Sequence, residues 1–435
     1  MFFGILSNNE AWLNNLTEKR IWSRVFSSNH FVKFLLIVLF IFGLFNGVYS
    51  ALMNSTDLQE HWVNTKSLIS GSNIYDESVY QQISSSAATQ YGLKPYDMYP
   101  IYLPSCYFML APFALMNWTM AKVSWLLLSL LLTFLLAKDI SNLFCSGKYF
   151  LLLLAALVCS IPWRHHIVYG QNAIWSLYFF VLAIKLSGQN KTFLSGLSLA
   201  LALFKYSLIG PMCLYFLIYK RVWKNLLIAI GLHGAVLCLF SVFLHQSIFY
   251  LLITPLKWCA HKSSGGAYDL LGFWNLLNGH PAWIPYIASG IVLLVLVFIL
   301  TRKYINDDAG ILALTAMVST ILTYHSMNDY IVLVLPIAWV LTQEKWDKSL
   351  SFFLIGVFLV GYLRGHYFHL DWHPFNAYVS GDAGNPEGVL TAKWGFKTLY
   401  MASYSLFWYL SIFILGLRLI RSHENPSSNL SAETK

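Results

Sequence analysis

The hydrophobic pattern of the chain is a series of apolar runs separated by polar or basic segments. Runs such as FLLIVLFIFGLF (residues 34–45) do not alternate between polar and apolar positions, which excludes the strands of a membrane barrel. Apolar runs of about 20 residues cross a bilayer as helices, because lipid cannot hydrogen-bond to the backbone. We therefore predict spanning helices over residues 34–53, 119–137, 149–162, 172–187, 225–245, 283–301, 309–324, 330–342, 349–363 and 399–418.

The segment over residues 191–221 needs a different arrangement. It is basic at both ends, too long for one straight span and too short for two full ones. Two half-length helices that meet between Lys205 and Pro211, with their tip directed outward, fit this length. Counting them, the sequence predicts an all-α bundle of about twelve transmembrane segments, two of them short.

Basic clusters indicate which end of each span faces the cytoplasm. Lys19, Arg20 and Arg24 place residues 1–33 inside, and the later clusters place both termini inside. The rest reads as one transmembrane domain over residues 34–420 with long outer connections. The predicted outer loops are 54–118, 246–282 and 364–398, and residues 421–435 are predicted to form a disordered cytoplasmic tail.

The first outer loop is long enough to contain structure of its own. Residues 57–70 and 76–91 are predicted to form short helices at the membrane interface. The apolar stretch 99–118 is interrupted by Pro100, Pro104 and Pro112, so we predict a juxtamembrane or re-entrant element there rather than a full span.

Composition supports a membrane protein and argues against a nucleic-acid partner. The chain is 57% hydrophobic and 11% charged, whereas soluble proteins carry about 25% charged residues. The net charge of +9 comes from short clusters between apolar runs, which are typical of topology signals. The six cysteines show no metal-binding spacing, so we interpret them as small core residues.

The predicted topology brings several polar side chains to the same outer side. The first is Asp57, which follows the first span and has two interpretations. It is either a capping or solvated acid, or a general base at the mouth of a membrane cavity. The others that share this side are Arg164, Gln171, Lys205, His325 and Asp329.

Lys205 is a candidate for binding an anion. An ammonium within an apolar helix is costly and usually faces a cavity or an anion, although a lysine near a helix end can also extend its amine to the interface. A phosphate near the outer leaflet would suit Lys205, with Arg164 as a second positive charge. His325 and Asp329 lie on a turn that either caps the next span or holds an acceptor or a leaving phosphate.

Other chemistry is not indicated. The sequence RGHYFHLDWHPF (residues 364–375) matches no compact zinc motif, and an aromatic interfacial loop fits it better. The chain has no glycine-rich nucleotide loop, no GxSxG and no HExxH. We expect no metal, no cofactor and no soluble nucleotide donor.

Several short motifs follow one another along the chain. An acid comes after the first span, and GSNIYD (71–76), GQN (170–172), GLSLALALFK (196–205), IYKRVWK (218–224) and YHSMNDYIVLVLPIA (324–338) follow in turn. In this order they resemble glycosyltransferase family 87 of the GT-C superfamily. Members use polyprenyl-phosphate-linked sugars, typically mannose. The resemblance implies a GT-C-type bundle over roughly residues 34–345 and assigns the catalytic base to Asp57.

We therefore expect an inverting, integral-membrane hexosyltransferase with the active site on the outer face of the bacterial inner (plasma) membrane. Its partners would be a polyprenyl-phosphate sugar donor, a lipid or glycan acceptor and membrane lipids. The donor phosphate would be bound by Lys205, Arg164 and His325. Substrate-binding residues would be Asp76, Gln171, Asn172 and Asp329. Two alternatives remain: a transporter or lipid-linked sugar flippase, and a membrane acyltransferase that uses His325.

Overall fold

The computed structural model describes residues 30–53, 56–91, 100–220, 222–263, 270, 274, 283–303, 307–322 and 327–343. Within these ranges the chain is helical and has no strand, which confirms the predicted all-α class. Among the described residues, three helical stretches are long and apolar enough to cross a membrane, or five if each of two bent pairs is one span. The count of twelve stays a prediction, and the expected spans 349–363 and 399–418 lie outside the described residues.

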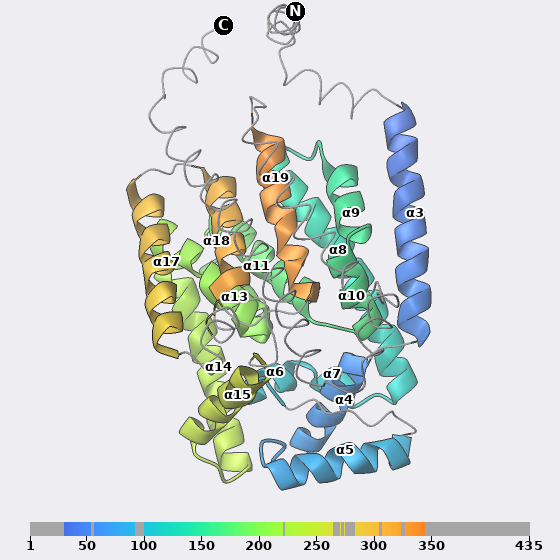
Figure 1. The fold of residues 1–435 in the computed structure, drawn as a ribbon, viewed down its shortest axis with the longest axis vertical. Coiled ribbons are helices and arrows are strands. Elements are labelled where there is room, and N and C mark those ends of the chain that lie inside the picture. The colour runs from blue at the N-terminus through green and yellow to red at the C-terminus, as the bar shows by residue number, and fades with distance from the viewer. Residues whose placement is uncertain are drawn as a thin grey trace, which may run out of the picture.

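Most of the helices run side by side as an upright bundle, with α3 and α17 at opposite edges (Figure 1). The helices α4–α7 and α15 gather at one end of it, which we call the α4 end (Figure 1). The bundle helices are α3 (His30–Met53), α8 (Trp118–Cys145), α9 (Phe150–Val158), α10 (Ile161–Tyr169), α11 (Ala173–Gly188), α12 (Thr192–Ala202), α13 (Tyr206–Met212), α14 (Trp223–Phe243), α17 (Trp283–Lys303), α18 (Asp308–Leu322) and α19 (Val334–Thr342). At the α4 end lie α4 (Thr56–Ile69), α5 (Glu77–Tyr91), α6 (Pro104–Met109), α7 (Ala111–Ala114) and α15 (Ile248–Ser263).

The outer surface of the bundle is strongly apolar. Phe42 of α3, Val242 of α14 and Ile284 of α17 are 71%, 74% and 84% exposed. A water-soluble surface would not carry large side chains like these along several whole helices. Their exposure fits a belt of lipid around the bundle.

Helix α3 packs closely on the bundle at Gly47, which fixes where the next helix begins. A Cβ atom built on Gly47 would lie 2.5 Å from the Trp163 ring, so only glycine allows this approach. The Trp163 indole is itself held by a hydrogen bond from its Nε1 to Thr133 Oγ1 (3.0 Å). The chain then bends by 48° into α4, which carries Asp57 in its first turn.

The two short helices predicted after the first span correspond to α4 and α5. Trp62 of α4 donates from Nε1 to the carbonyl oxygens of Phe113 (3.1 Å) and Met116 (3.3 Å), which ties α4 to the end of the proline-interrupted segment. In that segment Pro104 and Pro112 stand in the first turns of α6 and α7, where a missing N–H costs nothing. A position of these helices at the membrane interface stays a prediction.

The predicted span over 149–162 is wrong as a single element. The structure has two helices, α9 and α10, bent by 61° relative to each other. Ser160 accepts a hydrogen bond from the Trp163 N–H (3.1 Å) and Pro162 stands in the first turn of α10, so a new helix begins there. The helix continues to Tyr169 and contains residues that the sequence analysis placed beyond the span.

The segment over residues 191–221 agrees with the two predicted half-length helices. Thr192–Met212 is long and apolar enough for one span, but the one-turn 3₁₀ helix η1 (Leu203–Lys205) interrupts it, and Lys205 has φ −107° and ψ 73°, outside the helical region. Asn225 Nδ2 donates to Ser195 Oγ (2.7 Å), and His233 Nε2 lies 2.9 Å from the Ala200 carbonyl oxygen. α12 and α14 therefore run in the same direction, so the chain between them turns back at Lys205.

Two further elements differ from the prediction. The expected outer loop 246–282 begins with α15. The expected span 330–342 begins as the 3₁₀ helix η3 (Met327–Leu333) and becomes α-helical at Val334. Pro336 has no N–H to donate to the carbonyl four residues earlier, which accounts for the different winding before it.

The topology gives a direct test of which membrane face the α4 end occupies. Gln81 of α5 and Gln189, just after α11, are both exposed. α5 lies at the α4 end of the bundle (Figure 1), whereas the end of α11 lies near the end of α8, where Lys185 contacts Asp139. We expect an impermeant thiol reagent to label Gln81→Cys, but not Gln189→Cys, on intact cells in a background without native cysteines. Labelling of Gln189→Cys alone would reverse the assigned orientation.

Candidate active site

The turn after α10 brings the GQN motif against the start of α4. Gly170 has φ 69°, in the left-handed region, and ends α10 through a hydrogen bond from its N–H to the His166 carbonyl oxygen. A Cβ atom at Gly170 would overlap Leu58, the residue that follows Asp57. Glycine is therefore required on both counts. This close approach places the next residue, Gln171, beside Asp57.

The reversal at Lys205 delivers an ammonium to the same place. The Lys205 N–H donates to Ser176 Oγ (3.1 Å), near the start of α11. This contact sets the tip of the α12–α13 hairpin at the α4 end of the bundle. The Lys205 side chain is buried, and so is the Asp329 side chain of η3.

Four polar side chains form a continuous chain of contacts across this region. Gln171 Nε2 donates to Asp57 Oδ2. Lys205 Nζ donates to Gln171 Oε1 (3.5 Å) and forms an ion pair with Asp329 Oδ1 (2.5 Å). We call this set, from Asp57 through Gln171 and Lys205 to Asp329, the polar chain.

The polar chain runs from a half-buried acid to a buried ion pair. The side chains of Lys205 and Asp329 are 5% and 1% exposed, whereas Asp57 is partly accessible. Charges in so dry a position cost several kcal/mol each unless they are paired and hydrogen-bonded. Here each charge has the other, and the amide of Gln171 links the ammonium to the accessible carboxylate.

Two buried nitrogen atoms beside the polar chain have no hydrogen-bond partner among the described residues: Asn172 Nδ2 and His166 Nε2. His166 Nδ1 accepts from the Ile174 N–H (3.5 Å), so the proton of a neutral ring lies on Nε2. Asn172 Oδ1 accepts from Tyr102 Oη (3.5 Å). Buried polar atoms are normally satisfied, which makes these two N–H groups candidate contacts for a substrate.

Aromatic side chains form the wall next to Lys205. The Tyr102 ring stacks on Phe204 with centroids 5.8 Å apart, and His61 meets Tyr102 edge to face at 5.2 Å. Burial raises the pKa of Tyr102 well above its ordinary value, so the phenol stays neutral. An aromatic wall beside amide and carboxylate groups is suited to a sugar ring and its hydroxyls.

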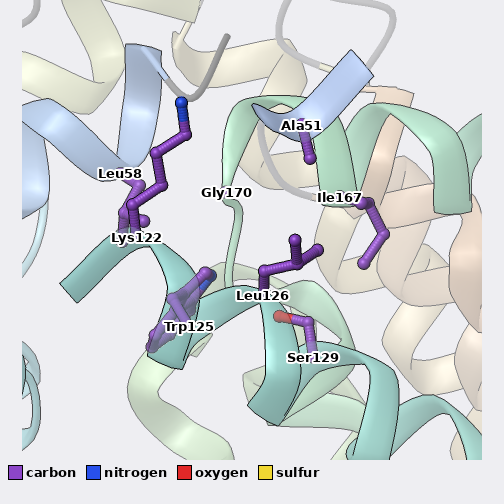
Figure 2. A pocket seen from close by; sticks show the side chains of 8 residues that line it. All are labelled: Ala51, Leu58, Lys122, Trp125, Leu126, Ser129, Ile167 and Gly170. Carbon is purple, nitrogen blue, oxygen red and sulfur yellow. The ribbon is translucent and has the colours of Figure 1, made fainter. Parts of the chain in front are cut away.

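A small pocket lies next to Leu58, the residue that follows Asp57 in α4. Ala51, Leu58, Trp125 and Gly170 are among its lining residues, and it has room for about one water molecule. Figure 2 shows Lys122 reaching from α8 toward the junction of α3 and α4, where its Nζ donates to the Leu52 carbonyl oxygen (2.7 Å). This contact stabilises the exposed carbonyl end of α3 directly before Asp57.

The remaining predicted site residues lie apart from the polar chain. Arg164 is exposed on α10 and is not joined to it by a contact between described residues. Asp76 is an exposed cap of α5: it accepts hydrogen bonds from Ser78 and from the Val79 N–H, and these lower its pKa below the ordinary value. His325 lies outside the described residues.

The sequence analysis missed three residues of this region: His166, Tyr102 and Glu60. Glu60 is 2% exposed and accepts from Asn64 Nδ2 (3.4 Å). Its spacing of three from Asp57 places it on the same helix face, which was a usable signal once residues 57–70 were read as a helix. No group of three or more His, Cys, Asp or Glu side chains suited to a metal occurs in the ranges that the structure describes.

Comparison with known protein families identifies the family of the chain. The model of glycosyltransferase family 87 matches residues 100–336, more than half of the 435 residues. The chain belongs to glycosyltransferase family 87. No curated protein and no solved structure matches it significantly. The matched range of this family 87 glycosyltransferase contains Gln171, Lys205 and Asp329, whereas Asp57 precedes it.

Family membership identifies the protein as a membrane glycosyltransferase, and the Gly170 turn should be essential to its polar chain. Gly170→Ala should cost about 1–2 kcal/mol for the left-handed backbone and about 1–3 kcal/mol for the overlap with Leu58. It should also separate Gln171 from Asp57 and lower glycosyl transfer. Thermal unfolding and turnover of the purified protein measure both effects.

The matched control for this change is Gly188→Ala. Gly188 ends α11, has no positive φ, and a Cβ atom there would meet no neighbour within 4 Å. It should leave stability and turnover close to wild type. Equal losses in the two variants would mean that the Gly170 turn has no special role.

Removing one charge of the buried ion pair should destabilise the protein more than removing both charges. Asp329→Asn leaves the Lys205 ammonium buried without its carboxylate and should destabilise the protein by about 3–5 kcal/mol. Lys205→Met/Asp329→Leu removes both charges and should be clearly more stable than the single variant. Unfolding in one detergent compares them, and a double variant as unstable as Asp329→Asn would contradict the pairing.

Proposed function

We propose that this glycosyltransferase moves a hexose, mannose in our assignment, from a polyprenyl-phosphate donor to a lipid or glycan acceptor. We further propose that it acts on the outer face of the bacterial inner membrane, with the α4 end as that face. The observation that carries the proposal is the polar chain: an accessible carboxylate, Asp57, joined through one amide to a buried ammonium, Lys205. Such a site has a proton acceptor and a cation on the two sides of a single amide group.

The reaction needs little more than these two groups. Asp57 would take the proton from an acceptor hydroxyl as its oxygen attacks the anomeric carbon. The bond between the anomeric carbon and the phosphate oxygen would break, and its electron pair would leave with the polyprenyl phosphate. Attack on the face opposite the leaving group inverts the anomeric configuration. Holding both reactants in line supplies much of the rate.

The leaving phosphate needs donors where its charge develops. Lys205 supplies an ammonium, but its charge is already balanced by Asp329, so further groups must contribute. The buried N–H groups of Asn172 and His166 lack partners among the described residues and are suited to phosphate oxygens. We propose that these complement Lys205, with Arg164 and His325 as additional phosphate-binding groups.

The lipid part of the donor has a place beside the bundle. The donor's polyprenyl chain would lie along the apolar outer surface, which supports a lipid-linked donor more than a soluble one. The absence of a nucleotide-binding motif in the sequence points the same way. A sugar carried on such a chain would enter the site from the side of the membrane.

Asp57→Asn tests the assigned base. The amide keeps the size of the side chain and removes its basicity, so folding should survive while turnover falls by about 10²–10⁴-fold. Transfer from radiolabelled polyprenyl-phosphomannose to a crude lipid or glycan extract measures it. Glu77→Gln, an exposed acid in the first turn of α5, is the matched control and should be close to wild type. Near wild-type turnover by folded Asp57→Asn would exclude Asp57 as the base.

A further inference from the structure

We propose that Gln171 is a positioning residue that fixes the catalytic carboxylate and couples it to the buried ion pair, rather than a residue that binds the sugar. The catalytic consequence rests on the proposed function, and the geometry rests on the contacts of the polar chain. Gln171 is 8% exposed and uses both ends of its amide on protein groups.

The charges on either side determine how the amide is oriented. A glutamine side chain has a donating end and an accepting end. Here the donating Nε2 faces the Asp57 carboxylate and the accepting Oε1 faces the Lys205 ammonium. The reverse orientation would set oxygen against carboxylate and N–H against ammonium, so both contacts would become repulsive. Lys205 therefore enforces the orientation in which Gln171 donates to Asp57.

The backbone prepares the side chain for this role. The Gln171 N–H donates to the His166 carbonyl oxygen (2.9 Å), in the left-handed cap of α10, and Gly170 lies against Leu58. These two contacts fix the backbone of Gln171 relative to α4, independently of the contacts that its side-chain amide makes. A hydrogen bond from such a group restrains the carboxylate of Asp57 in one rotamer.

A donated hydrogen bond also favours the ionised form of a carboxylate. With Gln171 present, the Asp57 carboxylate should remain ionised to a lower pH. With Gln171→Leu, protonation of Asp57 should occur at higher pH. A hydrogen bond to a charged group is equivalent to about one to two pH units, so the acidic limb of the pH profile of kcat/KM should move up by that amount.

The titration of Asp57 can be read without any substrate. The infrared carboxylate band of Asp57 is identified as the band that is missing from Asp57→Asn. The pH at which this band disappears on acidification is the pH at which Asp57 becomes protonated. Other titratable groups stay in place on the elements packed around the site. They are Glu60 and His61 on α4, Tyr102 before α6, Lys122 on α8, His166 on α10, Lys205 on η1 and Asp329 on η3.

The experiment compares Gln171→Leu with Asn225→Leu in the purified full-length protein. Asn225 is also a buried amide, 2% exposed, but its hydrogen bond is to Ser195 on α12. We expect the infrared titration to move up by about one to two pH units in Gln171→Leu and to stay in place in Asn225→Leu. No shift in Gln171→Leu, or an equal shift in both, overturns the proposal.

A second pair of variants tests the coupling to the ion pair. Lys205→Met/Asp329→Leu removes both charges without leaving one buried alone, and it frees the amide to turn. Its effect on the Asp57 titration should not add to that of Gln171→Leu when the three changes are combined. Strict additivity of the two effects would show that the Gln171 amide does not couple Asp57 to the ion pair of Lys205 and Asp329. If the wild type transfers no polyprenyl-linked sugar, the proposed function fails, while the infrared result still decides the role of Gln171.

Discussion

The structure depends on one electrostatic constraint: a lysine and an aspartate buried in the α4 end of a membrane bundle have to be paired. Lys205 and Asp329 come from segments over 120 residues apart, and their ion pair (2.5 Å) requires the chain to turn back at Lys205 and to enter η3 next to it. The hairpin of α12 and α13, held by the hydrogen bond from the Lys205 N–H to Ser176 Oγ, carries one of these charges to the site, and η3 carries the other.

The accessible end of the site depends on backbone geometry instead of charge. Gly47 lets α3 approach Trp163 and Gly170 lets the end of α10 approach Leu58, so α4 and the GQN turn meet with Asp57 and Gln171 in contact. Helix ends thus hold both members of the contact between Gln171 and Asp57. A glycosyltransferase gains from this arrangement, because the attacking hydroxyl and the leaving group must be held in line during transfer.

Much of this arrangement could be read from the sequence, for physical reasons that differ by element. Apolar run length and the lysine and arginine clusters indicated the membrane bundle and brought Asp57, Gln171, Lys205 and Asp329 to one side. The bend at Ser160 was missed, because a serine cap and a proline interrupt an apolar run without changing its hydropathy. His166 was missed because the predicted spans ended at residue 162 and began again at 172, which left it in the connection between them. That Lys205 pairs with Asp329 could not be predicted, because sidedness gives the level of a residue and not its neighbours.

We propose that glycosyl transfer takes place at the polar chain. A structure with a bound donor analogue tests this most directly. A cryo-electron microscopy map would be obtained with a non-transferable phosphonate analogue of a polyprenyl-phosphate sugar. We predict a phosphonate oxygen within hydrogen-bond distance of Lys205 Nζ, about 2.7–2.9 Å, and the anomeric carbon turned toward the side of Asp57. A phosphonate bound away from Lys205, with Asp57 facing no part of the sugar, would contradict the account.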